Sequence, residues 1–165
     1  MSARPSRGVT GRPLRAFSRS LPMALMQARE AVMAHFRPLL RAHGITEQQW
    51  RVLRALVAVD EASATEIAAR TCLSMPSLSR ILRSLERRAL VRRRVRPSDL
   101  RGAWIVITAR GRALVDRVGE ESEARYAEIE ARFGASRLAR LHRELADLSD
   151  AVGGRGSRSG DADRG

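Results

Sequence analysis

Arginine side chains gather in one short stretch of the chain, from residue 80 to residue 101. Nine arginines and two acidic residues lie in it, and nine minus two leaves a formal charge of +7. So high a charge density disfavours burial and favours a polyanionic partner. Ser77 and Ser79 lie just before the stretch. Hydroxyl groups can bond to base edges or phosphates and a guanidinium can fork onto guanine, so the predicted chemistry is nucleic-acid recognition.

The first part of this stretch is predicted to lie on a helix that begins after Ser74. Serine is a good N-cap, and Pro76 is tolerated in the first turn because its missing N–H would have had no partner there. Apolar residues follow at helical spacing and form one stripe to bury, namely Leu78, Ile81, Leu82 and Leu85. The residues of this helix that are expected to contact DNA are Ser74, Ser77, Ser79, Arg80 and Arg83. The alternative is that the arginines form the solvated face of an ordinary helix.

A hairpin with a basic tip is predicted to follow the helix. Val91–Val95 reads as a strand that contains three consecutive arginines, and Trp104–Ile107 is apolar and β-branched, as is typical of a second strand. Turn-forming residues separate the two strands, namely Pro97, Ser98, Asp99 and Gly102. A helix followed by such a hairpin is the arrangement of a winged helix-turn-helix, which counts against the ordinary-helix alternative.

Three further helices are predicted upstream. They span Ser20–Ala42, Thr46–Asp60 and Ser63–Arg70. With residues 71–73 as the turn, the third of these and the helix after Ser74 form the helix-turn-helix pair. Cys72 is alone in this apolar turn with no resolving partner, so a small buried hydrophobe is favoured over an oxidant-sensing thiol, which stays the alternative.

Two helices are predicted after the hairpin. Thr108–Phe133 carries a run of acidic residues, and Ala135–Val152 follows a break at Gly134. Leucines of the last helix recur at steps of three and four, which is an a/d seam. Together with the first helix, this region is expected to form an α-helical dimerisation layer remote from DNA. A two-fold dimer places two recognition helices one helical turn apart, ~34 Å, on a palindrome.

The composition of the chain limits the classes of protein to which it can belong. The chain has 165 residues, a formal net charge of +13 and a pI near 11.7, so one domain with an anionic partner is expected. All 31 basic residues are arginine. Its single cysteine excludes an intrachain disulfide framework, and its apolar runs are too short for a bilayer span or a secretory signal. These features predict a cytoplasmic bacterial protein that is associated with the nucleoid when bound to DNA.

The boundaries expected along the chain define segments 1–19, 20–152 and 153–165. The first segment contains five arginines and no acid, and the last is rich in glycine, serine, arginine and aspartate, so both are expected to be disordered tails. The basic arm is equally consistent with added non-specific DNA affinity and with an inert extension. Within the central domain, residues 20–44 and 109–152 are assigned to dimerisation and residues 45–108 to DNA binding.

Motifs of catalytic and metal sites are missing from the sequence. The three histidines are His35, His43 and His142, and none has H-x-x-x-H spacing. The HExxH, GxSxG and phosphate-loop patterns are also absent. We therefore expect no enzyme activity, no cofactor and no metal. The rival to a specific DNA-binding regulator is a basic architectural protein that coats DNA with little sequence preference.

The hairpin resembles the wing of the MarR family of transcriptional regulators. The residues that carry the resemblance are Pro97–Arg101, Trp104–Thr108 and Gly111. The resemblance covers nearly all of the chain except the tails and implies a mostly α (α+β) fold, a winged helix-turn-helix with an α-helical dimerisation layer. It implies that Arg101 enters the minor groove and that Asp99 braces the wing. Arg94 and Arg96 are expected to serve wing and phosphate contacts.

A second resemblance lies in the first two predicted helices. The residues concerned are Ser20–Glu30, Phe36–Pro38 and Gly44–Val52. They are similar to the branch of the MarR family that governs aromatic-acid catabolism. This likeness implies a homodimeric repressor of a catabolic operon. Such a repressor leaves its palindromic operator when a small aromatic acid binds, of the hydroxylated phenylacetate, benzoate or nicotinate type.

The same resemblance implies a ligand site between the dimerisation layer and the winged helix. An arginine should meet the carboxylate, because a forked pair is strong and directional. Arg51, next to Trp50, is the first candidate, His35 could reach a ring hydroxyl, and Arg29 is the third candidate. The alternatives stay open at this point: core packing for Trp50, an ordinary surface position for Arg51, and a satisfied helix histidine for His35.

Overall fold

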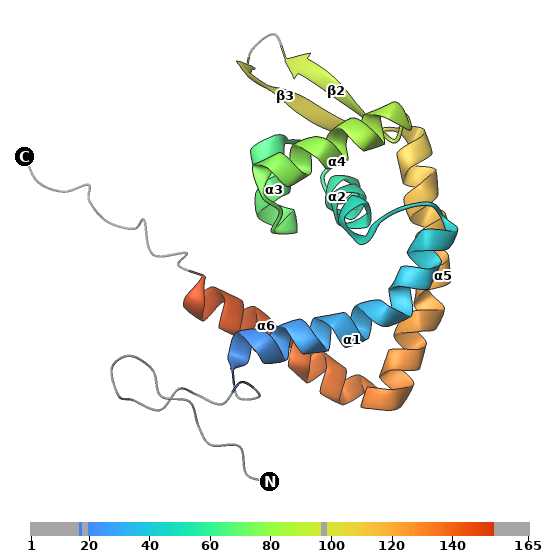
Figure 1. Ribbon diagram of the computed structural model, residues 1–165, viewed down its shortest axis with the longest axis vertical. Helices are drawn as coiled ribbons and strands as arrows, with labels where there is room; N and C mark the ends of the chain where they lie inside the picture. Colours follow the sequence, from blue (N-terminus) through green and yellow to red (C-terminus); the bar gives the residue numbers. More distant parts are fainter. Residues whose placement is uncertain (1–16, 18–19, 97–98, 154–165) are drawn as a thin grey trace, which may run out of the picture. The chain divides into compact units, whose positions relative to one another are not determined.

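The computed structural model of the chain describes residue 17 and residues 20–96 and 99–153, without the side chains of residues 95–103. The chain divides into two compact units, residues 1–125 and residues 126–165. The first unit contains, in order, α1 (Leu21–Ala42), α2 (Glu47–Val57), β1 (Glu61–Ser63), α3 (Ala64–Thr71), α4 (Met75–Arg87), β2 (Val91–Arg96), β3 (Asp99–Ile107) and most of α5 (Ala109–Phe133) (Figure 1). The second contains the end of α5 and α6 (Ala135–Val152).

Hydroxyl side chains start the three helices of the DNA-binding half. The Thr46 Oγ1 accepts from the Gln49 backbone N–H at 3.1 Å while the Gln49 side chain accepts from the Thr46 N–H, which is a complete capping box for α2. Ser63 and Glu66 form the same box for α3, and Ser74 caps α4. These caps fix where each helix begins, and therefore where the turn between α3 and α4 lies.

The helices α2, α3 and α4 pack around a common apolar core. All three helices and β3 contribute to it, and the following members are each at most 2% exposed: Leu53, Leu56, Ile67, Leu82 and Ile105. The predicted stripe of α4 is the buried face of that helix. The winged helix-turn-helix prediction is thereby confirmed in its main elements.

The prediction that the cysteine of the α3–α4 turn is buried is wrong. Cys72 is exposed, whereas the sequence predicted a buried hydrophobe. It adopts the left-handed conformation, with φ of 52°, and its backbone N–H donates to the Ala68 carbonyl as the C-cap of α3. A side chain at such a C-cap points away from the helix pair, and the apolar neighbour Leu73 is the residue that packs against the core instead.

The sheet contains a strand that the sequence analysis missed. The order is β1-β3-β2 with both pairings antiparallel, so β3 is central. In β1, Ala62 pairs with Ile105 and is buried, while the predicted start of α3 at Ser63 is also the last residue of β1. The two wing strands are longer than predicted, and an irregularity lies between Val95 and Arg96.

The root of the wing is closed by a tight approach of α5 to the residue just before β2. The Thr108 Oγ1 accepts from the Gly111 N–H at 3.0 Å and donates to the Leu90 carbonyl at 3.0 Å. Gly111 is buried, and a Cβ built on it would lie 2.2 Å from the Leu90 carbonyl oxygen. Only a glycine therefore allows α5 to leave the sheet at this point.

Gly111→Ala is expected to lower the free energy of unfolding by about 1–3 kcal/mol, since the new methyl group must push backbone away from backbone. The matched control is Gly119→Ala on the same helix, where a Cβ meets nothing within 4 Å. That control should gain roughly 0.5–1 kcal/mol from helix propensity. Urea unfolding at one protein concentration measures both. Equal stability of the two variants would contradict the close approach.

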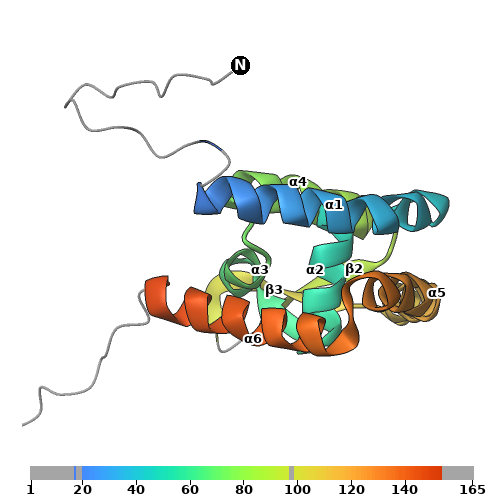
Figure 2. The same cartoon turned by 90° about the horizontal axis from the view of Figure 1, so that it is seen from below.

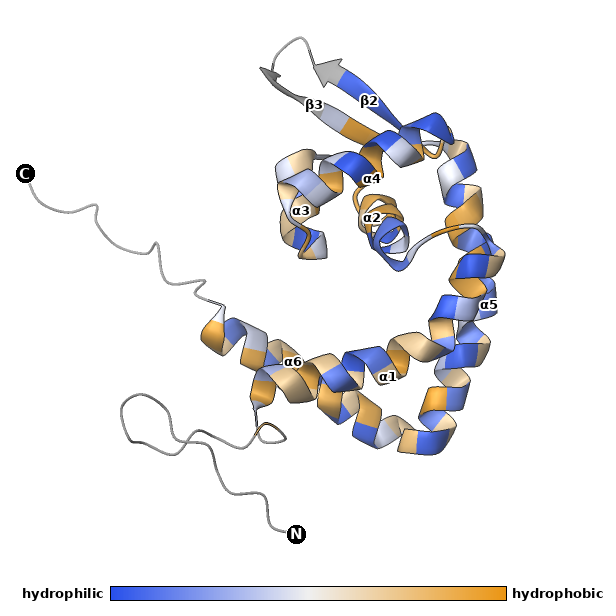
Figure 3. Cartoon of the chain, viewed as in Figure 1, coloured by the Kyte–Doolittle hydropathy of each residue, from blue (hydrophilic) through white to orange (hydrophobic). Residues whose placement is uncertain are grey.

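The second unit consists of the end of α5, a turn at Gly134 and α6. Gly134 has φ of +95°, and the Arg137 guanidinium lies 4.4 Å from the centroid of the Phe133 ring across this turn. The helix α6 runs without interruption (Figure 2) and has no buried residue, although hydrophobic segments, orange in Figure 3, alternate with hydrophilic ones along it. No helix in the described part of the chain has the length and hydropathy needed to cross a membrane.

Candidate nucleic-acid interface and adjoining hollow

The helix α4 exposes the polar residues that its apolar stripe leaves outside. Ser79, Arg80, Arg83 and Arg87 are exposed, and blue residues line this helix and β2 in Figure 3. Met75, in the first helical turn, is also exposed, at 44%. Residues at the N-terminal end of a recognition helix reach base edges. The face that the sequence predicted to read DNA is therefore open to a partner.

The exposed arginines differ in whether a carboxylate neutralises them. Arg80, Arg83, Arg87 and Arg92 have no acidic partner among the residues that the structure describes. An unpaired guanidinium is available to a phosphate or a guanine at no cost of breaking an ion pair. These four residues therefore form the available cationic surface, and the sequence analysis did not single out Arg87 or Arg92.

Two neighbouring arginines of β2 are paired. The Arg93 Nε lies 2.9 Å from the Glu86 Oε1, and the Arg94 Nη1 lies 3.8 Å from the Glu61 Oε2. The first pair joins β2 to α4 and the second joins β2 to β1. Arg94 was predicted as a phosphate contact, and with 49% of its side chain exposed it stays a prediction.

The three serines at the start of α4 have different roles. The Ser74 Oγ accepts from the Ser77 backbone N–H at 3.4 Å, so its acceptor is engaged in capping. Ser77 is partly buried, whereas Ser79 is exposed. Of the three, Ser79 presents its hydroxyl most freely.

The wing tip carries the remaining predicted contacts. Arg96 and Asp99 are register partners in the β2–β3 pair. Their side chains and that of Arg101 lie outside the described residues, as do Pro97 and Ser98. The predicted roles of Arg101 in the minor groove and of Asp99 as its brace therefore stay predictions.

Two hydrogen bonds fix α4 to the elements before it. The Arg88 Nη1 donates to the Gly44 carbonyl at 2.8 Å, and the Gln49 Nε2 donates to the Ser84 Oγ at 3.1 Å. Gly44 follows α1 and Gln49 belongs to α2. A shift of either segment would therefore pull directly on the recognition helix.

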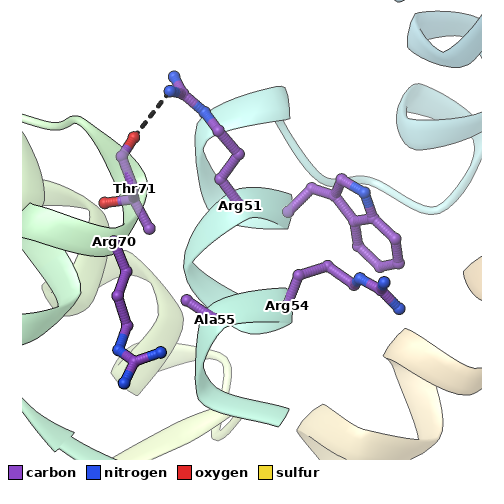
Figure 4. Close-up of a pocket in the computed structure, with 6 residues that line it drawn as sticks. Arg51, Arg54, Ala55, Arg70 and Thr71 are labelled. Atoms are coloured by element: carbon purple, nitrogen blue, oxygen red, sulfur yellow. Dashed lines mark hydrogen bonds between the residues drawn. The ribbon is translucent and has the colours of Figure 1, made fainter. Parts of the chain in front are cut away.

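A hollow of about 510 Å³ lies against α2 and the end of α3 (Figure 4). Its lining residues are Trp50, Arg51, Arg54, Ala55, Arg70 and Thr71. Its volume lies in the range of small-molecule sites, and an aromatic ring beside guanidinium groups suits an aromatic anion. We call it the α2–α3 hollow.

The two arginines of α2 point in different directions in the α2–α3 hollow. The Arg51 Nη1 donates to the Thr71 carbonyl at 2.8 Å, and its Nε is buried without a hydrogen-bond partner (Figure 4). Arg54 is exposed, and its guanidinium carbon lies 5.8 Å from the centroid of the Trp50 ring. Trp50 packs partly on the core and also lines the hollow, so its contact with a ligand stays a prediction.

The other two predicted ligand-binding residues lie elsewhere. Arg29 pairs with Glu30 at 2.7 Å and with Glu47, and Arg37 pairs with the same two carboxylates at 2.5 and 3.5 Å. The hydrogen bond and charge of Arg37 hold the pKa of Glu30 below its ordinary value. Arg29 lines a second hollow with Arg51, and His35 lines neither hollow. The structure thus places Trp50 and Arg51 in the lining of one hollow. Arg29 lines the neighbouring hollow, to which Arg51 also contributes.

Comparison with known proteins decides the family. The MarR family model matches residues 43–102, which include the helix-turn-helix and most of the wing. The homoprotocatechuate degradative operon repressor of Escherichia coli is 42% identical over 129 residues, which are 78% of this chain and 87% of that protein. This chain belongs to the MarR family. Proteins of this family are transcriptional regulators and not enzymes.

Solved structures of transcriptional regulators match most of this chain. NadR in complex with 4-hydroxyphenylacetate is 37% identical, with a TM-score of 0.72, over 84% of this chain and 98% of NadR. The repressor CouR bound to a 23-mer DNA duplex is 27% identical, with a TM-score of 0.74, over 84% of this chain and 99% of CouR. Both solved structures therefore share the fold of this MarR family protein.

The sequence analysis missed two arginines of the α2–α3 hollow, Arg54 and Arg70. A signal for Arg54 was present, since it follows Trp50 by four residues and must share its helix face. Arg51 is one residue beyond Trp50, so its side chain leaves the helix on another face. No local signal marks Arg70, because it reaches the hollow through the packing of α3 on α2.

Proposed function

We propose that this MarR family protein is a homodimeric repressor of a catabolic operon, released from a palindromic operator by a small aromatic acid. The observation that carries the proposal is that one compact unit holds both parts. Arginines of α4 and β2 that have no acidic partner among the described residues form a cationic surface, namely Arg80, Arg83, Arg87 and Arg92. A hollow lined by Trp50 and Arg54 lies beside the helix-turn-helix. In this proposal the repressor acts in the bacterial cytoplasm.

The exposed apolar side chains of α1 and α6 support the dimer. Leu25, Val32, Leu141 and Leu145 are each 37–42% exposed in the single chain. Covering such side chains with a second copy removes apolar area from water, worth ~25 cal/mol per Å² before the costs of association. A dimer also doubles the recognition helices on DNA.

The likeness to NadR in complex with 4-hydroxyphenylacetate supports an aromatic acid as the effector. In the α2–α3 hollow, Arg54 and Trp50 offer a guanidinium and a ring face to one ligand. Arg51 shares the hollow, and its hydrogen bond to Thr71 links ligand binding to the end of α3. His35 and Arg29 do not line this hollow, so their contacts with a ligand stay predictions.

A gel shift on the intergenic DNA upstream of its own gene tests the function. The expected result is a specific complex that a scrambled duplex does not form. One or more hydroxylated phenylacetates, benzoates or nicotinates should dissolve that complex. Equal binding to both duplexes with no response to any compound would favour an architectural DNA-coating protein instead.

Arg101→Ala is expected to weaken operator binding and to reduce the salt dependence. Each lost phosphate contact lowers the slope of log K against log salt by about one unit. Fluorescence anisotropy at four or more salt concentrations measures both quantities. Binding that is unchanged at every salt concentration would remove the wing from the DNA contacts.

A further inference from the structure

An ion pair joins the wing to the recognition helix. The Arg93 Nε donates to the Glu86 Oε1 at 2.9 Å. Glu86 belongs to the last turn of α4, and Arg93 belongs to β2, which begins a few residues after that helix ends (Figure 1). The pair therefore holds a cationic side chain of the wing against α4.

Both members of the pair belong to the surface that is expected to meet DNA. Glu86 follows Arg83, a predicted DNA contact, by three residues, so the two share one side of α4. Arg93 follows the buried Val91 by two residues, so it leaves β2 on the face that packs against the helices. Solvent still reaches both side chains, with 47% of Arg93 and 26% of Glu86 exposed. A phosphate at Arg83 would therefore meet this pair next.

The carboxylate of Glu86 works against a polyanion in two ways. Residues 80–101 contain only two acidic residues, of which Glu86 is the one on α4, and a negative charge there repels phosphates. The carboxylate also occupies a donor of Arg93, whereas Arg87 and Arg92 have no acidic partner among the described residues. A phosphate that approaches Arg93 must displace a carboxylate that is already held beside it.

We propose that Glu86 is a specificity-determining residue, which withholds Arg93 from phosphates and so lowers the affinity of the protein for DNA of any sequence. This inference rests on the DNA-binding part of the proposed function. Phosphate contacts carry no sequence information, so each contact that is withheld weakens non-specific binding. The pair also fixes β2 relative to α4, and an operator complex needs both elements in one register. It therefore favours the operator over the excess of competing sites.

Glu86→Gln in the full-length protein tests the inference by fluorescence anisotropy at several salt concentrations. The probes are the intergenic DNA upstream of its own gene and a scrambled duplex of the same length. Affinity for the scrambled duplex should rise about 10-fold per subunit near ~0.1 M salt, and the slope of log K against log salt should steepen by about one unit per subunit. Affinity for the intergenic DNA should rise less, because the wing is no longer held in register, so the ratio of the two affinities falls.

Two further variants separate the release of Arg93 from the loss of a negative charge. The double variant Glu86→Gln, Arg93→Gln should return the scrambled-duplex affinity and its salt slope to wild-type values, since the pair is again neutral and offers no added phosphate contact. Glu120→Gln is the control for net charge, because Glu120 is an exposed acid of α5, and it should change both quantities much less. Thermal unfolding checks that each variant is folded.

Three results would overturn this inference alone. They are a scrambled-duplex affinity in Glu86→Gln that equals that of the wild type at every salt concentration, a gain that persists in the double variant, and a gain of equal size on the two duplexes. A wild type that binds both duplexes equally, or neither of them, would overturn the proposal of specific DNA binding together with it.

Discussion

Replacing Arg80 by alanine is expected to abolish the preference of the protein for its operator. Arg80 is exposed in the first half of α4 and has no acidic partner among the described residues, so its guanidinium is free to fork onto a guanine. One such contact contributes ~1–3 kcal/mol of discrimination, and a dimer on a palindrome makes it twice. The expected loss of specific binding is therefore about 2–6 kcal/mol.

The measurement is fluorescence anisotropy on the operator and on a scrambled duplex of the same length. The ratio of the two affinities should collapse in Arg80→Ala, while non-specific binding changes much less. Arg117→Ala is the control, because it removes an exposed arginine from α5 instead of α4. An equal loss on both duplexes, with a smaller salt slope, would make Arg80 a phosphate contact and not a base contact.

Local patterns in the sequence were sufficient to predict the main elements that position this interface. The apolar stripe of α4 and its cap at Ser74 predicted the helix and its buried face, because both depend on residues close in the chain. The strand β1 was missed since three residues carry too little pattern. Its pairing with β3 joins Ala62 to Ile105, which is a contact between distant segments.

The state of each arginine could not be predicted from charge density. Arg93 and Arg94 looked equivalent to Arg92 in the sequence, yet Glu86 and Glu61 pair with the first two. Those carboxylates come from α4 and β1, so the pairing follows from the packing of the sheet beside the helix. In the same way, Arg70 enters the α2–α3 hollow only because α3 packs on α2.

Either Arg51 or Arg54 of α2 could hold the carboxylate of the effector. Substitutions of these two arginines are expected to give different results. Arg54 is exposed beside Trp50, so its side chain can take a ligand without giving up a hydrogen bond. Arg54→Ala is expected to weaken binding of 4-hydroxyphenylacetate about 10- to 100-fold, the worth of a hydrogen bond between charged groups. The concentration of the compound that releases the operator should rise by the same factor.

Arg51→Ala should act mainly on stability. It removes the donor that satisfies the Thr71 carbonyl, and such a loss costs about 1–3 kcal/mol of unfolding free energy. Calorimetry and urea unfolding on both variants separate the roles. Loss of compound binding in Arg51→Ala with unchanged stability, and normal binding in Arg54→Ala, would restore Arg51 as the carboxylate partner. The reverse pattern places the carboxylate at Arg54 and makes Arg51 the link that fixes the pocket helix to the turn before α4.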